Sequence, residues 1–595
     1  MVVETNHPDS HSQSPPVDNN INSDHLNLHH LPPNTPPEQP PSSASSSGAS
    51  SNSLPGTPSA TPNSNDEPCR EPSQTDRLNF RLLASFLERI NNGAFALPPH
   101  QPPSDDEGAG DPPAPRDPGL LQDAEALMKD AATAQGLLMR HPQVPDGLKT
   151  VPVTLFPTVL DRGMLEEVRG IQGSINALMH RVALDRGFIE GALAGAASVD
   201  PFIANLLEIY RQVDVEKQWQ LGLFRSDYLE HAPDSEENGT AGDGNNSKHP
   251  APARFKQVEV NTICVGLSGI GSRLAPCHSR ILNFLQPAFQ PDFPVSDSES
   301  LHLYGEALAL GHSVYCRQHP APHTRVLLFV IHKGFEFNIM DQRLVEFASG
   351  LPTLRRTMES LRSTARVDAD GRLWVEGLEV AVVYFRTAYM PDHYDGKVDW
   401  DLRLLIEKSE AIKCPSVAYQ LAGFKKIQQE LSRPEVLSRF LRDDPAACAA
   451  LLAVNMPQYD LADPSAAPAI ADALAHPARY VLKPNREGGG NNFYFQDLVD
   501  RIQAVRGTPL AQDYILMAKM QPSTQRNVLI RAQTPPAVVD AVSEVGVFGT
   551  VLARGETEML LNRRADAVLV RSKALGVNEG GLALGWSCLS SAWLV

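Results

Sequence analysis

The chain has 595 residues, of which 42% are hydrophobic and 21% are charged, so a sizeable folded core is expected. A formal net charge of −18 argues against a general nucleic-acid or membrane-surface binder, because phosphate backbones require a basic protein face, but it is compatible with a local basic pocket. The seven cysteines include no CxxC pair, so they fit neither a disulfide framework nor a zinc site and favour a reducing compartment.

The first 119 residues are expected to be a disordered, low-complexity extension. Pro, Ser, Asn, Thr and His dominate up to about residue 74, and a Pro- and Asp-rich linker runs to residue 119. Such a composition buries too little apolar surface to offset the conformational entropy lost on folding. Between these parts, RLNFRLLASFLERI (77–90) is amphipathic and predicts a short helix. There is no signal core and no apolar run approaches the roughly 20 residues of a membrane span, so the expected location is the cytoplasm.

From residue 120 onward, helical and strand patterns alternate and predict an α/β fold with mixed sheets. Helices are predicted at 120–138, 164–184 and 418–434, the last one ending at Pro434. Apolar runs predict strands at 325–332, 375–386 and 479–484. Residues 544–562 predict two antiparallel strands joined by a turn at Arg554–Gly555, and the polar stretch 231–253 predicts a surface loop.

The stretch KPNREGGGNNFY (483–494) places three consecutive glycines after a short strand. Glycine-rich backbone next to basic side chains often cradles phosphates, since N–H groups approach closely where no Cβ intervenes. The stretch is neither GxxxxGK[ST] nor GxGxxG, so the common nucleotide fingerprints do not explain it. Glu487 among the positive charges is either a metal ligand beside the phosphates or a simple salt-bridge partner of Arg486.

A second candidate site lies in QVEVNTI (257–263). Alternation along a strand projects Glu259 and Asn261 from the same face, where a carboxylate and an amide oxygen suit Mg²⁺. A solvent-facing strand edge is the alternative. VLVRSKA (568–574) similarly places Arg571 and Lys573 on one face, where they could neutralise a phosphoryl group or hold a carboxylate. A solvated charged strand is equally compatible with that pattern.

Two further signals are weaker. Asn338 and Gln342 lie one helical turn apart, so both amides could reach one ligand. Lys425, beside Lys426 in the predicted helix 418–434, reads by itself as an ordinary surface lysine. The sequence contains no GxSxG elbow and no HExxH motif, and its cysteines lack the context of a reactive thiolate.

Together these motifs resemble the eukaryotic glutathione synthetases, a family of ATP-grasp ligases. The resemblance covers residues 120–595 and leaves out the N-terminal extension. Its segments stand in the family's order: LGLFRSDY, QVEVNTI, NIMDQR, AVVYFRTAYMP, IKCPSVAYQLAGFKKIQQELSRP, YVLKPNREGGGNNFY, YILMAKM, SEVGVFG and VRSKALGVNEGGLALG. A GGG triplet alone is a weak signal, but these segments in this order are specific.

The resemblance implies an ATP-grasp fold with mixed sheets, an inserted α/β substrate-binding domain at 322–423 and a glycine-rich lid. The catalytic region would then comprise 120–321 and 424–595. It further implies ATP- and Mg²⁺-dependent ligation of γ-L-glutamyl-L-cysteine with glycine, through an acyl phosphate, in a homodimer. No enzyme nucleophile is needed for that reaction.

The same resemblance assigns residues to each ligand. The implied magnesium ligands are Glu259, Asn261 and Glu487. The implied ATP-binding residues are Leu229, Lys425, Lys483, Gly488, Gly489, Gly490, Asn491, Asn492, Tyr494, Met517, Ala518, Lys519, Met520, Glu544, Lys573 and Glu579. The implied dipeptide-binding residues are Arg225, Cys264, Gly266, Asn338, Gln342, Arg386, Tyr389, Arg571, Leu582 and Ala583. Arg571, Lys483 and Lys573 would carry the catalytic positive charge.

Some positions depart from the family pattern. Cys264 and Gly266 stand where serines are usual, so two hydroxyl contacts to the dipeptide would be missing. Ala518 replaces an acidic hinge residue, Thr387 replaces an aspartate, and Glu579 stands for a shorter aspartate. Two other functions are therefore considered: a synthetase that uses β-alanine or serine as the acceptor, with its specificity in 577–584, and a non-catalytic nucleotide-binding scaffold.

Overall fold

The computed structural model describes residues 118–144, 146–232, 253–285, 299–486, 490–532, 534–578, 580–582 and 585–595. The predicted disordered extension, its helix at 77–90 and most of the loop expected at 231–253 lie outside these ranges. Within them, no helix combines the length and the apolar character that a bilayer crossing requires.

The predicted helices at 120–138 and 164–184 are confirmed, the second as two helices that meet at Ile171. Aspartates begin several helices: the side chains of Asp161, Asp185 and Asp200 each accept a hydrogen bond from a backbone N–H of the first turn. The α-helices are α2 (Pro118–Ala134), α3 (Arg162–Gly170), α4 (Gln172–Leu184), α5 (Arg186–Val199), α6 (Pro201–Arg211), α7 (Ala275–Leu285), α8 (Glu299–Gln318), α9 (Ile339–Ser349), α10 (Met358–Thr364), α11 (Lys397–Lys408), α12 (Val417–Ala422), α13 (Lys425–Leu431), α14 (Pro434–Phe440), α15 (Pro445–Val454), α16 (Ala467–Ala475) and α17 (Phe495–Val505).

The strands belong to one large mixed sheet and three smaller sheets among the described residues. They are β1 (Leu138–Arg140), β2 (Leu148–Thr150), β3 (Val153–Thr154), β4 (Thr158–Leu160), β5 (Gln220–His231), β6 (Arg254–Asn261), β7 (Arg325–Ile331), β8 (Thr353–Thr357), β9 (Ala365–Val367), β10 (Leu373–Val375), β11 (Leu378–Phe385), β12 (Ile412–Cys414), β13 (Gln458–Asp460), β14 (Tyr480–Pro484), β15 (Tyr514–Ala518), β16 (Gln525–Arg531), β17 (Thr534–Arg554), β18 (Glu558–Ala574), β19 (Cys588–Ser590) and β20 (Ala592–Leu594). The predicted strands at 325–332 and 479–484 and the predicted hairpin at Arg554–Gly555 are confirmed as β7, β14 and the β17–β18 connection.

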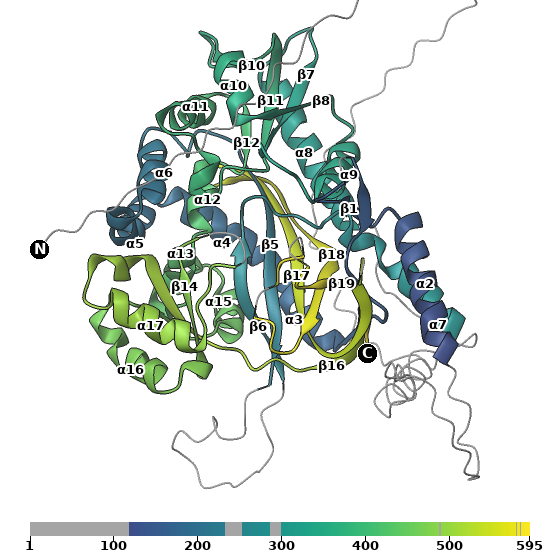
Figure 1. The fold of residues 1–595 in the computed structure, drawn as a ribbon. Coiled ribbons are helices and arrows are strands. Elements are labelled where there is room, and N and C mark those ends of the chain that lie inside the picture. The colour runs from purple at the N-terminus through teal and green to yellow at the C-terminus, as the bar shows by residue number, and fades with distance from the viewer. Residues whose placement is uncertain are drawn as a thin grey trace, which may run out of the picture. The chain divides into compact units, whose positions relative to one another are not determined.

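The long antiparallel strands β5, β17 and β18 form the middle of the large sheet (Figure 1). β6 pairs with the outer edge of β5, while β16, β3 and β19 connect β17 back to β18, so that end of the sheet closes on itself. On the other side, β12, β11, β7 and β8 run parallel and are linked through α9, α10 and α11. A separate antiparallel sheet of β13, β15 and β14 has its own apolar core with α16 and α17.

Two predicted elements are wrong in detail. The strand expected at 375–386 is confirmed over Leu378–Phe385 as β11, but it begins later than predicted, because Glu376 and Gly377 both have positive φ (52° and 83°) and join β10 to β11 in a tight turn. The helix expected at 418–434 is broken at Gly423, where a Cβ would lie 2.1 Å from Thr262 Oγ1. Pro434 does not end that helix but begins α14, since proline is compatible with the first helical turn.

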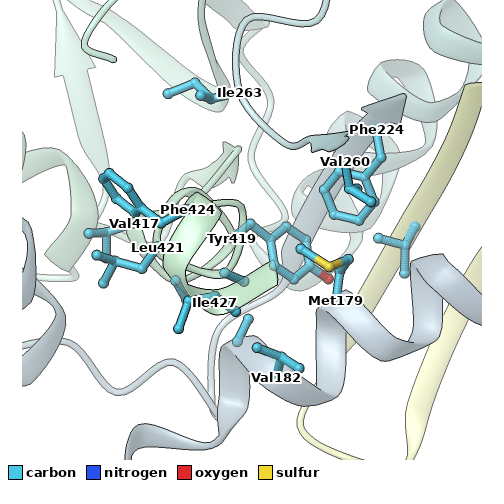
Figure 2. Close-up of a cluster of buried hydrophobic side chains, with 14 of the residues drawn as sticks. Met179, Val182, Phe224, Val260, Ile263, Val417, Tyr419, Leu421, Phe424 and Ile427 are labelled. Carbon is cyan, nitrogen blue, oxygen red and sulfur yellow. The ribbon is translucent and has the colours of Figure 1, made fainter. Parts of the chain in front are cut away.

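An apolar cluster joins α4, α12 and the β5–β6 pair and so fixes the strands that carry the candidate site. Figure 2 shows Tyr419 of α12 lying among Phe224, Val260 and Met179. The rings of Tyr419 and Phe224 meet edge to face with centroids 5.2 Å apart, and His180 is hydrogen-bonded to the Tyr419 hydroxyl at 2.8 Å. Burial of these groups ties β5 and β6 to the helix that precedes Lys425.

Candidate active site

A cavity of about 400 Å³ lies between the two sheets, with β5, β6, β17 and β18 on one side and β14 and β15 on the other. It brings together most of the predicted ATP-binding residues from six strands, α13 and two glycine-rich segments. The predicted residues that line it are Leu229, Glu259, Lys425, Lys483, Asn492, Tyr494, Met517, Ala518, Lys519, Met520, Glu544, Arg571 and Lys573.

One end of the cavity is apolar. Val481 and Met517 are cross-strand partners on β14 and β15, and Met517, Met520 and Val481 are buried in a small cluster with Leu229 and Val258 packed against it. Because the two faces of the adenine ring are flat and apolar, such a slot suits a nucleobase. Val258 was not predicted from the sequence: it is the extra residue of a β-bulge opposite Asp227 and Tyr228, which lets consecutive residues, Val258 and Glu259, both line the cavity.

The other end is charged. Glu259 lies 3.3 Å from the Nζ atom of Lys425, and Lys483 donates a hydrogen bond to the Val258 carbonyl at 3.4 Å. Burial opposes the charge on Glu259, but attraction from Lys425, Lys483 and Arg571 outweighs it and lowers the pKa of Glu259 to about 2. The reading of Lys425 as a surface lysine is wrong, since it is buried at the start of α13 and also donates to the Arg486 carbonyl at 2.8 Å. This end therefore holds an ionised carboxylate within a cationic pocket.

Two glycine-rich segments meet at the cavity. The carbonyl oxygen of Asn578 accepts hydrogen bonds from Lys573 Nζ at 2.8 Å and from the Tyr494 hydroxyl at 3.4 Å. Gly490 has φ of +90°, a conformation that side chains disfavour. Arg486 pairs with Asp200, the residue that begins α6. The predicted residues Glu487, Gly488, Gly489, Glu579 and Ala583 lie outside the described residues.

The predicted dipeptide residues gather beyond Arg571. Arg571 donates to Asp227, which also binds Arg225, and the remaining nitrogen of Arg225 donates to the Gly266 carbonyl at 3.0 Å. A Cβ on Gly266 would lie 3.4 Å from Asn338 Nδ2 and 3.5 Å from Arg386 Nη2, so these groups lie close together and mark the predicted dipeptide space.

The other predicted dipeptide residues make the following contacts. Gln342 donates to Asn338 Oδ1 at 3.1 Å, and Cys264 Sγ contacts the Phe385 and Thr387 carbonyls. The Tyr389 backbone N–H is held by His393, while Leu582 is buried among apolar side chains. Glu336, which also hydrogen-bonds Gln342, was missed, because a lone glutamate in a loop carries no sequence signal.

The loop from Cys264 to Ile270 is held in place by one carboxylate. Asp341 of α9 is buried and accepts hydrogen bonds from the backbone N–H groups of Leu267, Gly269 and Ile270 at 2.7, 2.8 and 3.1 Å. Cys264 and Leu267 have φ of 53° and 72°, which non-glycine residues adopt at a cost. Such strain is typical of functional loops that the surrounding structure holds in place.

The expected magnesium ligands are only partly described. Within the described ranges, no three His, Cys, Asp or Glu side chains are grouped closely enough to hold a metal ion. The predicted set instead combines the carboxylate of Glu259 with the amide of Asn261, whose Nδ2 donates to Asp227 at 2.9 Å, and with Glu487 outside these ranges. The predicted magnesium site therefore uses an amide oxygen beside the carboxylate oxygens.

We expect the Phe495 ring to stabilise bound nucleotide, although this residue adopts a strained backbone conformation. It lines the cavity with φ of 50°, and its ring lies 4.7 Å from Lys519 Nζ. We expect Phe495→Gly to raise the free energy of unfolding by up to about 1 kcal/mol, since glycine tolerates this φ, and to raise the KM for ATP severalfold. Thermal denaturation of the ligand-free protein and ATP kinetics measure the two effects.

The control is Glu376→Gly, which relieves a similar φ of 52° in the β10–β11 turn. It should leave the KM for ATP unchanged. A destabilised Phe495→Gly protein with an unchanged KM would show instead that the ring is only a packing group.

Comparison with known proteins places the chain in a family. The model of the eukaryotic glutathione synthase ATP-binding domain matches residues 120–594. The glutathione synthetases of Homo sapiens and Bos taurus are 38% and 36% identical, each over 80% of this chain and 98% of the relative. The chloroplastic glutathione synthetase of Solanum lycopersicum is 32% identical over 75% of this chain and 78% of the relative.

A solved glutathione synthetase-like effector of Globodera pallida shares the fold, with a TM-score of 0.62 at 21% identity over 80% of this chain and 98% of that chain. The predicted mixed α/β fold is therefore confirmed as an ATP-grasp-type fold. From residue 120 to residue 594, the chain belongs to the eukaryotic glutathione synthase family.

Proposed function

We propose that this protein ligates γ-L-glutamyl-L-cysteine to glycine with ATP, giving glutathione, ADP and phosphate. The main support is that the two predicted binding regions are directly connected. Arg571 lines the nucleotide cavity and is joined through Asp227 to Arg225, which lies beside the predicted dipeptide space. ATP, the phosphoryl donor, could therefore lie in the cavity with the dipeptide carboxylate, the acceptor, next to it in the dipeptide space.

Magnesium fits the donor groups that the described residues supply. Glu259 is ionised at any physiological pH, because its pKa is lowered to about 2 by the surrounding cations despite partial burial. The Asn261 amide nitrogen donates to Asp227 and to the Arg225 carbonyl, which leaves the amide oxygen as the acceptor atom for a hard cation. Together with Glu487, these residues would hold Mg²⁺, which when bound neutralises phosphate charge during transfer.

The proposed reaction requires that the substrates are held in position and that fixed positive charges lie beside the phosphates. A carboxylate oxygen of the dipeptide's cysteine attacks the γ-phosphorus of ATP, and the bond from that phosphorus to the ADP oxygen breaks. Glycine's amine then attacks the acyl carbon, the carbon–oxygen bond to phosphate breaks, and the amine loses a proton. Lys425, Lys483 and Lys573 supply positive charge around the phosphates, and Arg571 would stabilise the reacting carboxylate.

Water has to be excluded, since an acyl phosphate hydrolyses readily. The glycine-rich segments around Asn492 and Asn578 border the cavity and already touch through Tyr494. We assign them the role of a lid over the phosphates. We further propose a substrate-binding domain at 322–423, a homodimer and a cytoplasmic location, as the family resemblance implies.

Glycine is the acceptor that we expect. The curated relatives, the tomato protein included, are named glutathione synthetases, and this favours glycine over β-alanine or serine. With ATP, Mg²⁺ and the dipeptide, the full chain should release ADP in multiple turnovers only when an acceptor is added. Because one methylene changes recognition by about 10–200-fold, kcat/KM for β-alanine should be at least about tenfold below that for glycine.

A coupled assay of ADP release with a panel of acceptors measures this. Equal efficiency for β-alanine would identify a different acceptor specificity. Absence of dipeptide-dependent ADP release in every mixture would support the scaffold reading instead.

A further inference from the structure

Asp227 is a buried carboxylate at the junction of the nucleotide cavity and the dipeptide space, and the reaction itself makes no use of it. It lies on β5 and its side chain is fully buried. Four N–H donors surround it: Arg225 Nε at 2.6 Å, Arg225 Nη2 at 2.8 Å, Asn261 Nδ2 at 2.9 Å and Arg571 Nη2 at 3.0 Å. No other carboxylate among the described residues is bonded to both arginines.

The Arg225–Asp227 pair is bidentate, which fixes the plane of the guanidinium as well as its position. The remaining nitrogen of Arg225, Nη1, donates to the Gly266 carbonyl at 3.0 Å. Among the described residues these bonds engage all three nitrogens and still leave one N–H on each terminal nitrogen for a ligand. The direction of those two N–H groups is therefore set by Asp227.

The sheet is built to accommodate this pair. Asp227 is the cross-strand partner of Gly546 on β17, and a Cβ there would lie 2.7 Å from Arg225 Cδ and 2.9 Å from Asp227 Oδ1. Any side chain at position 546 would displace the pair, because both contacts are closer than real Cβ atoms show. Because Gly546 has no side chain, the Asp227 carboxylate has room to lie edge to edge with the Arg225 guanidinium.

The same carboxylate orients an amide. Since a carboxylate only accepts hydrogen bonds, the Asn261 atom that faces it must be the NH₂ group, so the amide oxygen points the other way. Arg571 of β18 also pairs with this carboxylate, and it pairs in addition with Glu544 on the neighbouring strand β17. One side chain thus holds groups from three strands, β5, β6 and β18.

We propose that Asp227 is a positioning residue: it aligns Arg225 and Arg571 for the dipeptide and turns the Asn261 oxygen toward the metal side of the site. This inference rests on the proposed ligase function and deepens it. Asp227 touches neither substrate nor nucleotide in this role and acts only through the three side chains that it binds.

The test uses Asp227→Asn in the full-length chain, because asparagine keeps the shape but presents an NH₂ group where an acceptor is needed. The dissociation constant of γ-glutamylcysteine, measured by isothermal titration calorimetry, should rise at least about tenfold. At saturating Mg²⁺, the KM for ATP should change less than about twofold. Binding of Mn²⁺ in the presence of ADP, measured by electron paramagnetic resonance, should weaken by about tenfold or more.

Asp399→Asn is the matched control. Asp399 is equally buried and holds Arg362 through two bonds of 2.7 Å, but it lies outside the site. It should lower thermal stability without changing dipeptide binding, so a general effect of losing a buried ion pair is separated from positioning. Gly546→Ala is the second variant: it keeps every charge, displaces the pair sterically, and should also weaken dipeptide binding even where Asp227→Asn fails to fold.

The outcomes separate the two proposals. Wild-type protein that neither binds the dipeptide nor turns it over would overturn the ligase function. Active wild-type protein, with dipeptide binding in Gly546→Ala and in folded Asp227→Asn within about twofold of normal, would overturn the positioning role alone. Unchanged Mn²⁺ binding in folded Asp227→Asn would remove Asn261 from that role.

Discussion

Arg571→Lys protein should fold normally and lose about 10²–10³-fold in kcat. Arg571 is partly buried, donates to Asp227 at 3.0 Å and pairs with Glu544 across the strands. A planar guanidinium can hold these carboxylates while presenting further N–H groups to a substrate carboxylate, whereas a lysine ammonium provides a single point charge on a flexible stem. Since the charge is conserved, the loss would report the geometry of the guanidinium. Steady-state ADP release and circular dichroism measure activity and fold.

Arg563→Lys is the matched control for this change. Arg563 lies on the same strand, β18, is exposed and pairs with Glu306 at 2.9 Å. It should retain full turnover and thermal stability. If Arg571→Lys also kept its kcat within about twofold, the assignment of Arg571 to the reacting carboxylate would be wrong.

Glu259→Gln should lower turnover by about 10²–10³-fold and raise the Mg²⁺ concentration that half-saturates the enzyme. The substitution keeps the shape of the side chain but removes a negative charge that attracts Lys425 and Lys483. An amide is a weaker magnesium ligand than an ionised carboxylate, and loss of the Glu259 charge would leave the site more positive and less attractive to the metal. Titration of activity with Mg²⁺, beside calorimetry of ATP binding, measures both effects.

Glu558→Gln is the control, since Glu558 pairs with Arg554 at 2.6 Å at the far end of the β17–β18 hairpin. It should leave the Mg²⁺ dependence unchanged.

The sign of the pH effect follows from the lowered pKa of Glu259: the stabilising charge is fully present above the ordinary value of 4.5 and is lost only as pH falls toward 2. A loss of wild-type activity between pH 7 and pH 5 would therefore come from other groups, and an unchanged Mg²⁺ requirement in Glu259→Gln would contradict its role as a ligand.

The sequence predicted the parts of the site that follow from local spacing. Alternation placed Arg571 and Lys573 on one face of β18, and both line the cavity. Helical spacing joined Asn338 to Gln342, which are hydrogen-bonded in the structure. The resemblance to glutathione synthetases supplied the rest of the nucleotide set, and most of those residues do surround one cavity.

The missed features depend on contacts between segments far apart in the chain or on departures from regular spacing. Val258 lines the cavity because a bulge interrupts the alternation of β6, which no periodicity predicts. Lys425 is buried because Glu259 and the Arg486 carbonyl receive its ammonium group. The importance of Asp227 becomes visible only when β6 and β18 bring Asn261 and Arg571 to it.

The contact between the two glycine-rich segments has a consequence for how this enzyme can diversify. Lys573 and Tyr494 both bond to the Asn578 carbonyl, which is a main-chain atom. Any residue at position 578 supplies the same oxygen, so the side chain at this position can change while the coupling between the segments persists. A substitution at position 578 could therefore alter acceptor recognition without removing the contact that helps to protect the intermediate.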